Sequence, residues 1–485
     1  MLQETDKMEE RKSSLDSLTE KYVEYKQTTE QFQKELEVRF GTRGKDIKRN
    51  EFENVIKKLQ SCGYINTNPE GIHMLRIMLK YNEQESAITT IRSEIQNIEN
   101  IQQFCKTNRL PNSSGVSFQK KLNVKKDGVK LLPYINNDYL FKVSFQIEDN
   151  IHSQSQLIQT KLLERWEQIP KSYRHMNRLI LKSNDETNPL VFHLTIIKSS
   201  EKNSKGEYLY EKNIGNVNLF DKPETYEIEI EIDNEIVSKQ MITSEQLSIH
   251  MRKGIKQVLC GLQNTNYPVP YKQLNAVKRE YLKLVGIEKD VTNVVSKDFI
   301  GPGSITLQMH NVQDNLQETT EANIRKNYSV TEKADGERRL LFICQRGNVY
   351  LIDTNMNILF TGLQTKKKNI CSSLLDGELI LHDKFGKFIN LFAAFDVYFI
   401  NNEDRRELHF RYESELNQKM SIVKKKNKEK EKVEQGRLSL LEKLVRVFND
   451  DINERNIRVN FQVQHKEFYM FGNIFEHCNT ILTKA

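Results

Sequence analysis

The sequence predicts an α+β protein in which an antiparallel β barrel precedes a second strand-containing domain. The chain has 485 residues, which is more than one ordinary domain holds, so two or three domains are expected. From about residue 85 to 235, short segments alternate polar and apolar side chains between turn-prone residues, a pattern typical of a closed barrel. A helical stretch over 236–298 then precedes a second strand-rich region over 299–400.

The composition indicates a soluble intracellular protein. Hydrophobic residues make up 37% and charged residues 29%, with a formal net charge of +7. Such mild basicity is compatible with a nucleic-acid partner and is also common without one. The six cysteines are scattered, which argues against structural zinc and a disulfide framework. No run is long enough to span a membrane and no signal peptide is recognisable, so we expect a cytoplasmic location.

Four regions are predicted along the chain. Residues 1–33 are rich in Glu, Lys, Gln and Thr and are expected to form a charged arm or a solvated helix. Residues 34–236 form the barrel domain, 237–298 a helical linker, and 299–485 the second domain.

Within the barrel domain, residues 46–60 have helical spacing. Near the C-terminus, residues 424–432 are almost all Lys and Glu and are expected to form an insertion loop or an exposed helix. Alternating strands are predicted at 35–41 and near 118–126, 140–148, 174–182, 190–198 and 226–233.

Two of these strands each place several carboxylates on one face, because successive side chains of a strand point to opposite faces. Like charges at this spacing repel unless cations lie among them, and hard carboxylate oxygens suit Mg²⁺ or Mn²⁺. For each strand taken singly, the alternative is an ordinary amphipathic strand with its charges in water. The carboxylates are Glu35, Glu37, Glu227, Glu229 and Glu231.

Basic side chains are expected on the same lining. Arg39 shares a face with Glu35 and Glu37, and Arg174 and Arg178 are four residues apart on one strand. Cations in these positions would hold phosphate groups.

The two carboxylate strands resemble those of the triphosphate tunnel metalloenzymes, which include the metal-dependent RNA triphosphatases of fungi and large DNA viruses. The resemblance implies an eight-stranded antiparallel tunnel in which a water attacks the γ-phosphorus of a bound triphosphate. It implies metal binding by the five glutamates and orientation of the water by Glu148. The triphosphate-binding residues that it implies are Arg39, Arg174, Arg178 and Thr195.

Two positions depart from the family pattern. Met176 stands where the family has the middle one of three alternate basic residues. His193 stands where an aspartate is expected, two residues before Thr195.

A second group of motifs surrounds Lys333, which is followed by Asp335, Gly336 and Arg338. A lysine nucleophile must lose its proton, which desolvation and nearby cations favour. Glycine permits a tight turn and the close approach of a nucleotide. Taken alone, the motif could also be a chance surface turn.

This segment resembles the first motif of the covalent nucleotidyltransferases, which include capping guanylyltransferases and polynucleotide ligases. Segments 374–381 and 390–398 agree in order and spacing with later motifs of that family. The resemblance implies a lysyl-nucleotide intermediate on Lys333, contact of Glu378 with ribose or metal, and stacking of Phe395 on the purine. The GTP-binding residues that it implies are Asp335, Gly336, Arg338, Glu378, Phe395 and Asp396.

The ends of the second domain carry weaker resemblances. Residues 299–307 resemble the segment that leads into the guanylyltransferase domain of large cytoplasmic DNA virus enzymes. Residues 475–482 resemble the helix before the family's fourth motif, so that motif and a C-terminal OB fold would follow the end of this chain. We therefore expect an incomplete domain within a longer enzyme, whose viral relatives continue into a cap methyltransferase.

Together the motifs predict an mRNA capping enzyme of the large cytoplasmic DNA virus type. An RNA triphosphatase using Mg²⁺ or Mn²⁺ would act on 5′-triphosphate RNA, and a guanylyltransferase would then use GTP, with a cap methyltransferase domain or subunit as a further partner and no membrane. One alternative is an ATP-dependent polynucleotide ligase carrying AMP on Lys333. Another is an RNA-binding scaffold with decayed sites, of which Met176 and His193 would be signs.

Overall fold

The computed structural model divides into two compact units, residues 1–264 and 265–485. It describes residues 14–26, 29, 31–41, 45–84, 87–112, 114–126, 129–314, 323–325, 328–412, 435–457, 460–470 and 472–484. The predicted Lys/Glu loop at 424–432 and residues 1–13 of the predicted arm lie outside these ranges.

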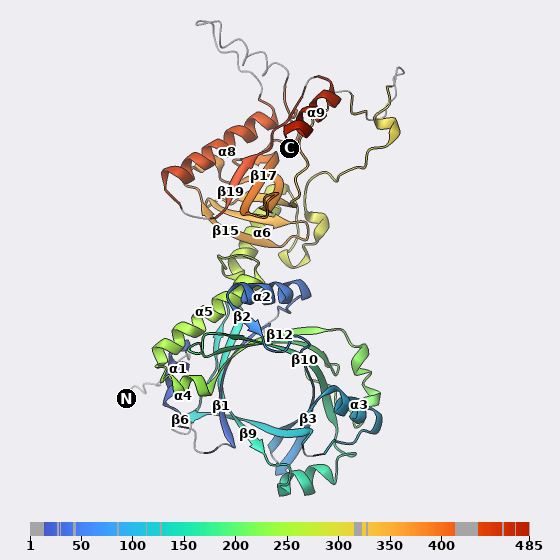
Figure 1. Ribbon diagram of the computed structural model, residues 1–485, viewed down its shortest axis with the longest axis vertical. Helices are drawn as coiled ribbons and strands as arrows, with labels where there is room; N and C mark the ends of the chain where they lie inside the picture. Colours follow the sequence, from blue (N-terminus) through green and yellow to red (C-terminus); the bar gives the residue numbers. More distant parts are fainter. Residues whose placement is uncertain are drawn as a thin grey trace, which may run out of the picture. The chain divides into compact units, whose positions relative to one another are not determined.

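The first unit is built on a closed antiparallel barrel. Its strands follow the order β1-β12-β11-β10-β3-β4-β5-β9, and β9 pairs with β1 to complete the ring of eight. Figure 1 shows this ring in end view. The predicted eight-stranded antiparallel barrel is confirmed. Its strands are β1 (Phe32–Phe40), β3 (Ile72–Gln84), β4 (Ala87–Gln96), β5 (Val116–Asn123), β9 (Phe141–Ile151), β10 (Lys171–Ser183), β11 (Leu190–Ser199) and β12 (Thr225–Ile232).

The alternation along the strands places polar side chains inside the barrel and apolar side chains outside it. On β1, the side chains of Leu36, Val38 and Phe40 are buried against helices outside the barrel. Their neighbours Glu37 and Arg39 consequently point inward. Figure 1 shows α1, α2 and α5 outside one wall and α3 outside another. The helices of this unit are α1 (Leu15–Glu24), α2 (Arg49–Ser61), α3 (Ile98–Thr107), α4 (Asn234–Lys239), α5 (Ser244–Leu262) and the π-helix η1 (Leu157–Leu163).

Some expectations for this unit were wrong. Helix α1 is not a solvated helix, because Leu15, Leu18 and Tyr22 recur at helical spacing and are buried in the core. Strand β3 begins before residue 85, and α3 and η1 interrupt the region that the sequence presents as strands only. The remaining short strands of the unit are β2 (Tyr64–Asn66), β6 (Lys125–Lys126), β7 (Val129–Lys130) and β8 (Tyr134–Asn136).

The second unit contains one mixed sheet with the order β15-β14-β13-β16-β17-β18, in which β19 lies parallel to β17. Helix α8 covers one face through Leu441 and Phe448, and α6 covers the other through Tyr281. The strands are β13 (Glu337–Ile343), β14 (Asn348–Asp353), β15 (Ile358–Gln364), β16 (Ser373–His382), β17 (Phe388–Ile400), β18 (Glu403–Asp404) and β19 (Gln462–His465). The helices are α6 (Tyr271–Val285), α8 (Arg437–Glu454) and α9 (Ile474–Lys484).

The helices of the predicted linker are shared between the units, since α5 packs in the core of the first and α6 in the core of the second. The described residues between 299 and 336 form turns, irregular backbone and the short 3-10 helix η6 (Met309–Asn311), with one isolated bridge from Val330 to Tyr469. The strands expected there begin only at Glu337. All six cysteines are free. Within the described ranges, no helix combines the length and apolarity that crossing a bilayer requires.

Candidate active sites

Acidic side chains from β1 and β12 meet the imidazole of His193, on β11, inside the barrel. The antiparallel register pairs Glu37 with Glu231 and Arg39 with Glu229. These side chains form two groups. Within each group, the potential ligand atoms all lie within 4.8 Å of one another, and Glu231 belongs to both groups. One group is Glu35, Glu37 and Glu231, and the other is His193, Glu229 and Glu231.

This donor set fits a divalent cation. Carboxylate oxygens are the ligands that Mg²⁺ and Mn²⁺ prefer, and the imidazole adds a donor that suits transition metals better than Mg²⁺. Glu37 is held in place by Ser144, whose hydroxyl donates to Oε1 at 3.1 Å. Glu227, the remaining predicted metal ligand, belongs to neither group and pairs with Arg174 at 2.8 Å.

The carboxyl groups of the acidic cluster differ in the direction of their pKa shifts. Burial raises the pKa of Glu35 to about 7, although Lys121 forms an ion pair with it. Burial acts in the same direction on Glu229, but Arg39 and Arg178 outweigh it and hold the pKa of that carboxyl well below its usual range. For Glu231, burial is outweighed by the hydrogen bond to His193, which lowers the pKa. The cluster therefore holds both a carboxyl that is easily protonated and others that stay ionised.

The predicted triphosphate-binding residues lie on the same lining. Arg39 pairs with Glu229 and with Glu37, and Arg178 donates to the Thr195 hydroxyl at 3.2 Å. The Nε atoms of Arg39 and Arg174 are buried without a hydrogen-bond partner in the described part of the chain. Such unpaired donors are costly unless an acceptor such as a phosphate oxygen meets them.

Glu148 also lies inside the barrel, beside a lysine that sequence reasoning missed. The ammonium group of Lys121 lies 3.5 Å from Glu148 and forms an ion pair with Glu35. Lys121 thus links the predicted water-orienting residue to the acidic cluster. Its alternation with Leu122 in a predicted strand could have indicated an inward position.

Two further arginines were missed because neither β3 nor β4 is among the strands predicted from the sequence. Arg76 lies between the buried residues Leu75 and Ile77 and pairs with Glu94 at 2.5 Å. Arg92 lies 4.0 Å from Glu148, and burial lowers its pKa. The lining is consequently richer in cations than the sequence motifs indicate.

Met176 has a local structural role in this lining. It packs with Met74 and Ile197 in a small apolar cluster and is 1% exposed. The three residues are register partners on β3, β10 and β11. The position that departs from the basic pattern therefore belongs to a small apolar cluster, against which Ile72 also packs.

In the second unit, Lys333 lies in irregular backbone just before β13. Its side chain is 87% exposed and donates to Asp335 at 3.1 Å. A Cβ on Gly336 would lie 3.0 Å from the Cβ of Glu378, so this glycine lets the Lys333 segment run close to β16. The structure thus brings the first and second predicted motifs together.

Arg338 connects this site to the earlier segment that contains Pro302. Its guanidinium donates to Asp376 at 2.6 Å and to the carbonyl of Pro302 at 2.7 Å. The Asp376 side chain is fully buried and also accepts from the Tyr398 hydroxyl at 2.5 Å. Burial raises the pKa of Asp376, whereas Arg338 acts in the opposite direction.

Glu378 and Phe395 meet at Lys466, a residue that no sequence motif indicated. The ammonium group of Lys466 lies 3.1 Å from Glu378 and 5.6 Å from the centre of the Phe395 ring. Asp396 turns to the other side and binds Arg437 at 2.9 Å, at the start of α8. The site therefore combines a carboxylate, a buried ammonium group and an aromatic face.

A closed eight-stranded barrel followed by this sheet and motif arrangement defines a two-domain protein with a C-terminal guanylyltransferase-type domain. Residues 263–481 match the family described as mRNA capping enzyme, catalytic domain. For these residues, the predicted resemblance to capping enzymes is confirmed.

One relative matches part of the chain. A probable mRNA-capping enzyme of Acanthamoeba polyphaga mimivirus is 30% identical over 191 residues, which cover 39% of this chain and 14% of that protein. The chain thus spans only a small part of the length of this relative.

Solved structures that align with the chain do so at low similarity. The RNA triphosphatase domain of a trifunctional mimivirus mRNA capping enzyme is 15% identical, with a TM-score of 0.34, over 49% of this chain and 94% of that one. The S. pombe Pct1 RNA triphosphatase is 12% identical, with a TM-score of 0.25, over 52% and 90%. The barrel assignment depends on the strand order of this chain and not on these alignments.

Proposed function

We propose that this chain carries out the first two reactions of mRNA 5′ capping. The barrel hydrolyses the γ-phosphate of 5′-triphosphate RNA in a metal-dependent reaction. The second domain transfers GMP from GTP to the resulting 5′-diphosphate RNA through a lysyl-GMP intermediate on Lys333. The observation that supports the first activity is the pair of candidate cation-binding groups that share Glu231, beside arginines with unpaired donors, inside a closed barrel.

In the barrel, arginines bind the triphosphate, and a carboxylate positions the attacking water. Arg39, Arg174 and Arg178 hold the triphosphate oxygens, with Thr195 orienting Arg178. Glu148 orients a water whose oxygen attacks the γ-phosphorus, and the bond from that phosphorus to the β–γ bridging oxygen breaks. Bound Mg²⁺ or Mn²⁺ would neutralise the phosphate charge and polarise the γ-phosphoryl group.

In the second domain, the Lys333 amine attacks the α-phosphorus of GTP. A P–N bond forms, the bond to the pyrophosphate oxygen breaks, and the terminal oxygen of 5′-diphosphate RNA then displaces the lysine. Phe395 offers a stacking face for the purine, and Glu378 contacts the ribose or a metal. Arg338, fixed by Asp376, binds phosphate.

The substrates are 5′-triphosphate RNA and GTP, and the site of action is the cytoplasm. The capped product is a substrate for a cap methyltransferase, present either as a further domain or as a separate subunit. Both Mg²⁺ and Mn²⁺ are compatible with the donor set of the barrel.

The first test is the release of γ-phosphate from 5′-triphosphate RNA by the full chain, with Mg²⁺, with Mn²⁺ and with EDTA. Metal-dependent release that Glu37→Ala and Glu229→Ala abolish would support the triphosphatase. A folded, metal-supplied protein that releases nothing would exclude it and favour the scaffold alternative.

The second test identifies the nucleotide on Lys333. The chain is incubated with α-labelled GTP or ATP, and the protein is examined for a covalent label. A label from GTP supports guanylyl transfer, whereas a label from ATP alone would replace this proposal with the ligase alternative.

A further inference from the structure

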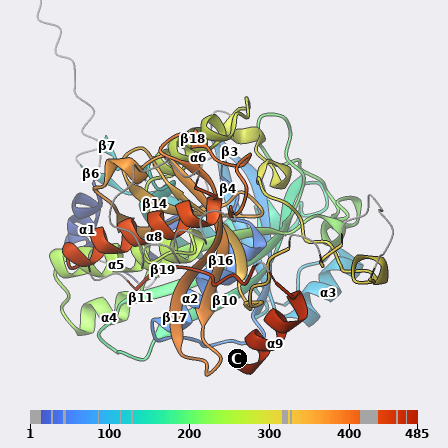
Figure 2. The ribbon, with the colours of Figure 1, turned by 90° about the horizontal axis from the view of Figure 1, so that it is seen from above.

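The two ends of the barrel carry different charged groups, and we propose that the polynucleotide part of the RNA lies across the end that carries β6 and β7. The proposal rests on the proposed triphosphatase activity and adds the direction in which its substrate lies. Figure 2 shows the β6–β7 hairpin and helix α4 at opposite ends of the first unit. We call these the β6 end and the α4 end.

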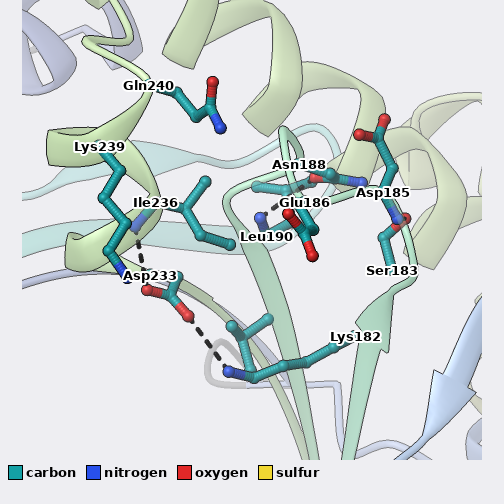
Figure 3. Close-up of a pocket in the computed structure, with 11 residues that line it drawn as sticks. Lys182, Ser183, Asp185, Glu186, Asn188, Leu190, Asp233, Ile236, Lys239 and Gln240 are labelled. Atoms are coloured by element: carbon teal, nitrogen blue, oxygen red, sulfur yellow. Dashed lines mark hydrogen bonds and ion pairs between the residues drawn. The ribbon is translucent and has the colours of Figure 1, made fainter.

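The α4 end has a pocket in which carboxylates outnumber ammonium groups. This pocket of about 340 Å³ opens between the ends of β10 and β12 and helix α4. Figure 3 shows Lys182 of this pocket paired with Asp233, at 3.1 Å. Lys239 pairs with Glu235 at 3.2 Å. The carboxylates that line the pocket are Asp185, Glu186 and Asp233.

These carboxylates would repel the negatively charged phosphodiester chain of an RNA. Both lysines that line the pocket are already paired with a carboxylate, so a nucleic acid would have to break these pairs to be held there. Like charges brought together without counterions repel. The α4 end therefore suits the departure of a small ion better than the binding of a polyanion.

The β6 end carries a pair of lysines that face each other. Lys125 and Lys130 are direct register partners across the β6–β7 hairpin, and both are exposed. Like charges directly opposite each other destabilise a pair of strands. A polyanion lying across the hairpin relieves this repulsion, because its phosphates bind between or beside the two ammonium groups.

The order of residues along β1 points in the same direction. The strand begins at Phe32 at the α4 end, so Glu35 lies closer to that end than Arg39 does. At the opposite end of β1, Arg39 and Lys142 are register partners. A γ-phosphate at the carboxylates therefore places the α- and β-phosphates near Arg39 and the nucleoside toward the β6 end.

The test measures binding of a labelled 20-nucleotide RNA that carries a non-hydrolysable 5′-β,γ-imidotriphosphate. Only the bound fraction that inorganic tripolyphosphate displaces is counted, because this fraction occupies the barrel. The paired variants are Lys125→Glu/Lys130→Glu at the β6 end and Lys182→Glu/Lys239→Glu at the α4 end. Thermal unfolding checks that each variant remains folded.

We expect the β6-end variant to bind this RNA on the order of 10-fold more weakly, and its salt slope to fall by about one per lost lysine contact. The affinity for tripolyphosphate, which has no nucleotides, should match that of the parent. Weaker RNA binding in the α4-end variant only, or equal binding in both variants, would overturn the proposal. Failure of the parent to hydrolyse 5′-triphosphate RNA is a separate result that bears on the proposed function.

Discussion

His193 and Glu231 form a pair inside the barrel, with 2.8 Å between Nδ1 and Oε1. They belong to the neighbouring strands β11 and β12, and Glu231 also faces the carboxylates of β1. The side chain that departs from the family aspartate therefore stands within the candidate cation site. Its imidazole replaces a hard oxygen donor with a nitrogen donor.

This replacement should change which cation binds best. We expect His193→Asp to lower the preference for Mn²⁺ over Mg²⁺ by about tenfold, because carboxylate oxygen suits Mg²⁺ better than imidazole does. The ratio is measured by Mn²⁺ electron paramagnetic resonance with Mg²⁺ as competitor. His152→Asp makes the same exchange at an exposed position and should leave the ratio unchanged. An unaltered ratio in His193→Asp would remove His193 from the set of ligands.

The glutamates of β12 should differ in their importance for cation binding. Glu231 belongs to both candidate groups, whereas Glu227 belongs to neither and pairs with Arg174. Glu231→Gln should therefore abolish Mn²⁺ binding in calorimetric titrations, and Glu227→Gln should retain it. Equal losses in the two variants would show that the cation extends to Glu227, as the family resemblance implies.

Glu35 should make the stability of the cation-free protein depend on pH. Folding raises the pKa of this carboxyl from 4.5 to about 7, so the folded state binds the proton more tightly than the unfolded state. The resulting stabilisation is complete below about 4.5 and is lost as the pH rises to about 7.

Glu35→Gln removes this dependence. In EDTA at pH 8, we expect the variant to exceed the parent in free energy of unfolding by on the order of 1–3 kcal/mol, and at pH 4.5 to be close to it. Denaturant unfolding at both values measures the difference. A variant that is less stable than the parent at pH 8 would mean that the ion pair with Lys121 dominates the energy of Glu35.

The sequence indicates which side chains share a face of a strand, but it does not indicate which strands pair with each other. Alternation alone separates Glu35, Glu37 and Arg39 from the apolar side of β1, and this is how the structure has them. Only the long-range register brings Glu231 opposite Glu37, and family resemblance had to supply that step.

The residues that were missed have the same physical explanation. Lys466 meets Glu378 because β19 lies parallel to β17, a pairing of distant segments with no local pattern. Arg76 does have the alternating pattern, but its strand lies before the strand-like region that begins near residue 85. Met176 shows the reverse case, since its two apolar partners are visible only after the strands are paired.

Asp376 should be important for the stability of the second unit. Its side chain is fully buried between Arg338 and Tyr398, so its removal leaves a guanidinium and a hydroxyl without their acceptor. We expect Asp376→Ala to lower the free energy of unfolding by about 3 kcal/mol. Glu403→Ala, which breaks a more exposed pair with Arg405, should cost less than about 1 kcal/mol. Urea unfolding compares the two, and equal costs would contradict the importance of the buried pair.

Lys333 should carry the whole of the covalent label. The side chain is 87% exposed, so Lys333→Arg can be made without disturbing the core, and arginine can keep the ion pair with Asp335. An arginine cannot form the lysyl phosphoramidate, and we therefore expect labelling by α-labelled GTP to fall to background. Lys367→Arg, a control at another lysine of the same unit that pairs with a surface carboxylate, should label like the parent.

The Lys333→Arg protein should still release γ-phosphate, because the barrel belongs to the other unit. A label that persists in Lys333→Arg and maps by peptide mass spectrometry to Lys466 would transfer the nucleophile to the lysine beside Glu378.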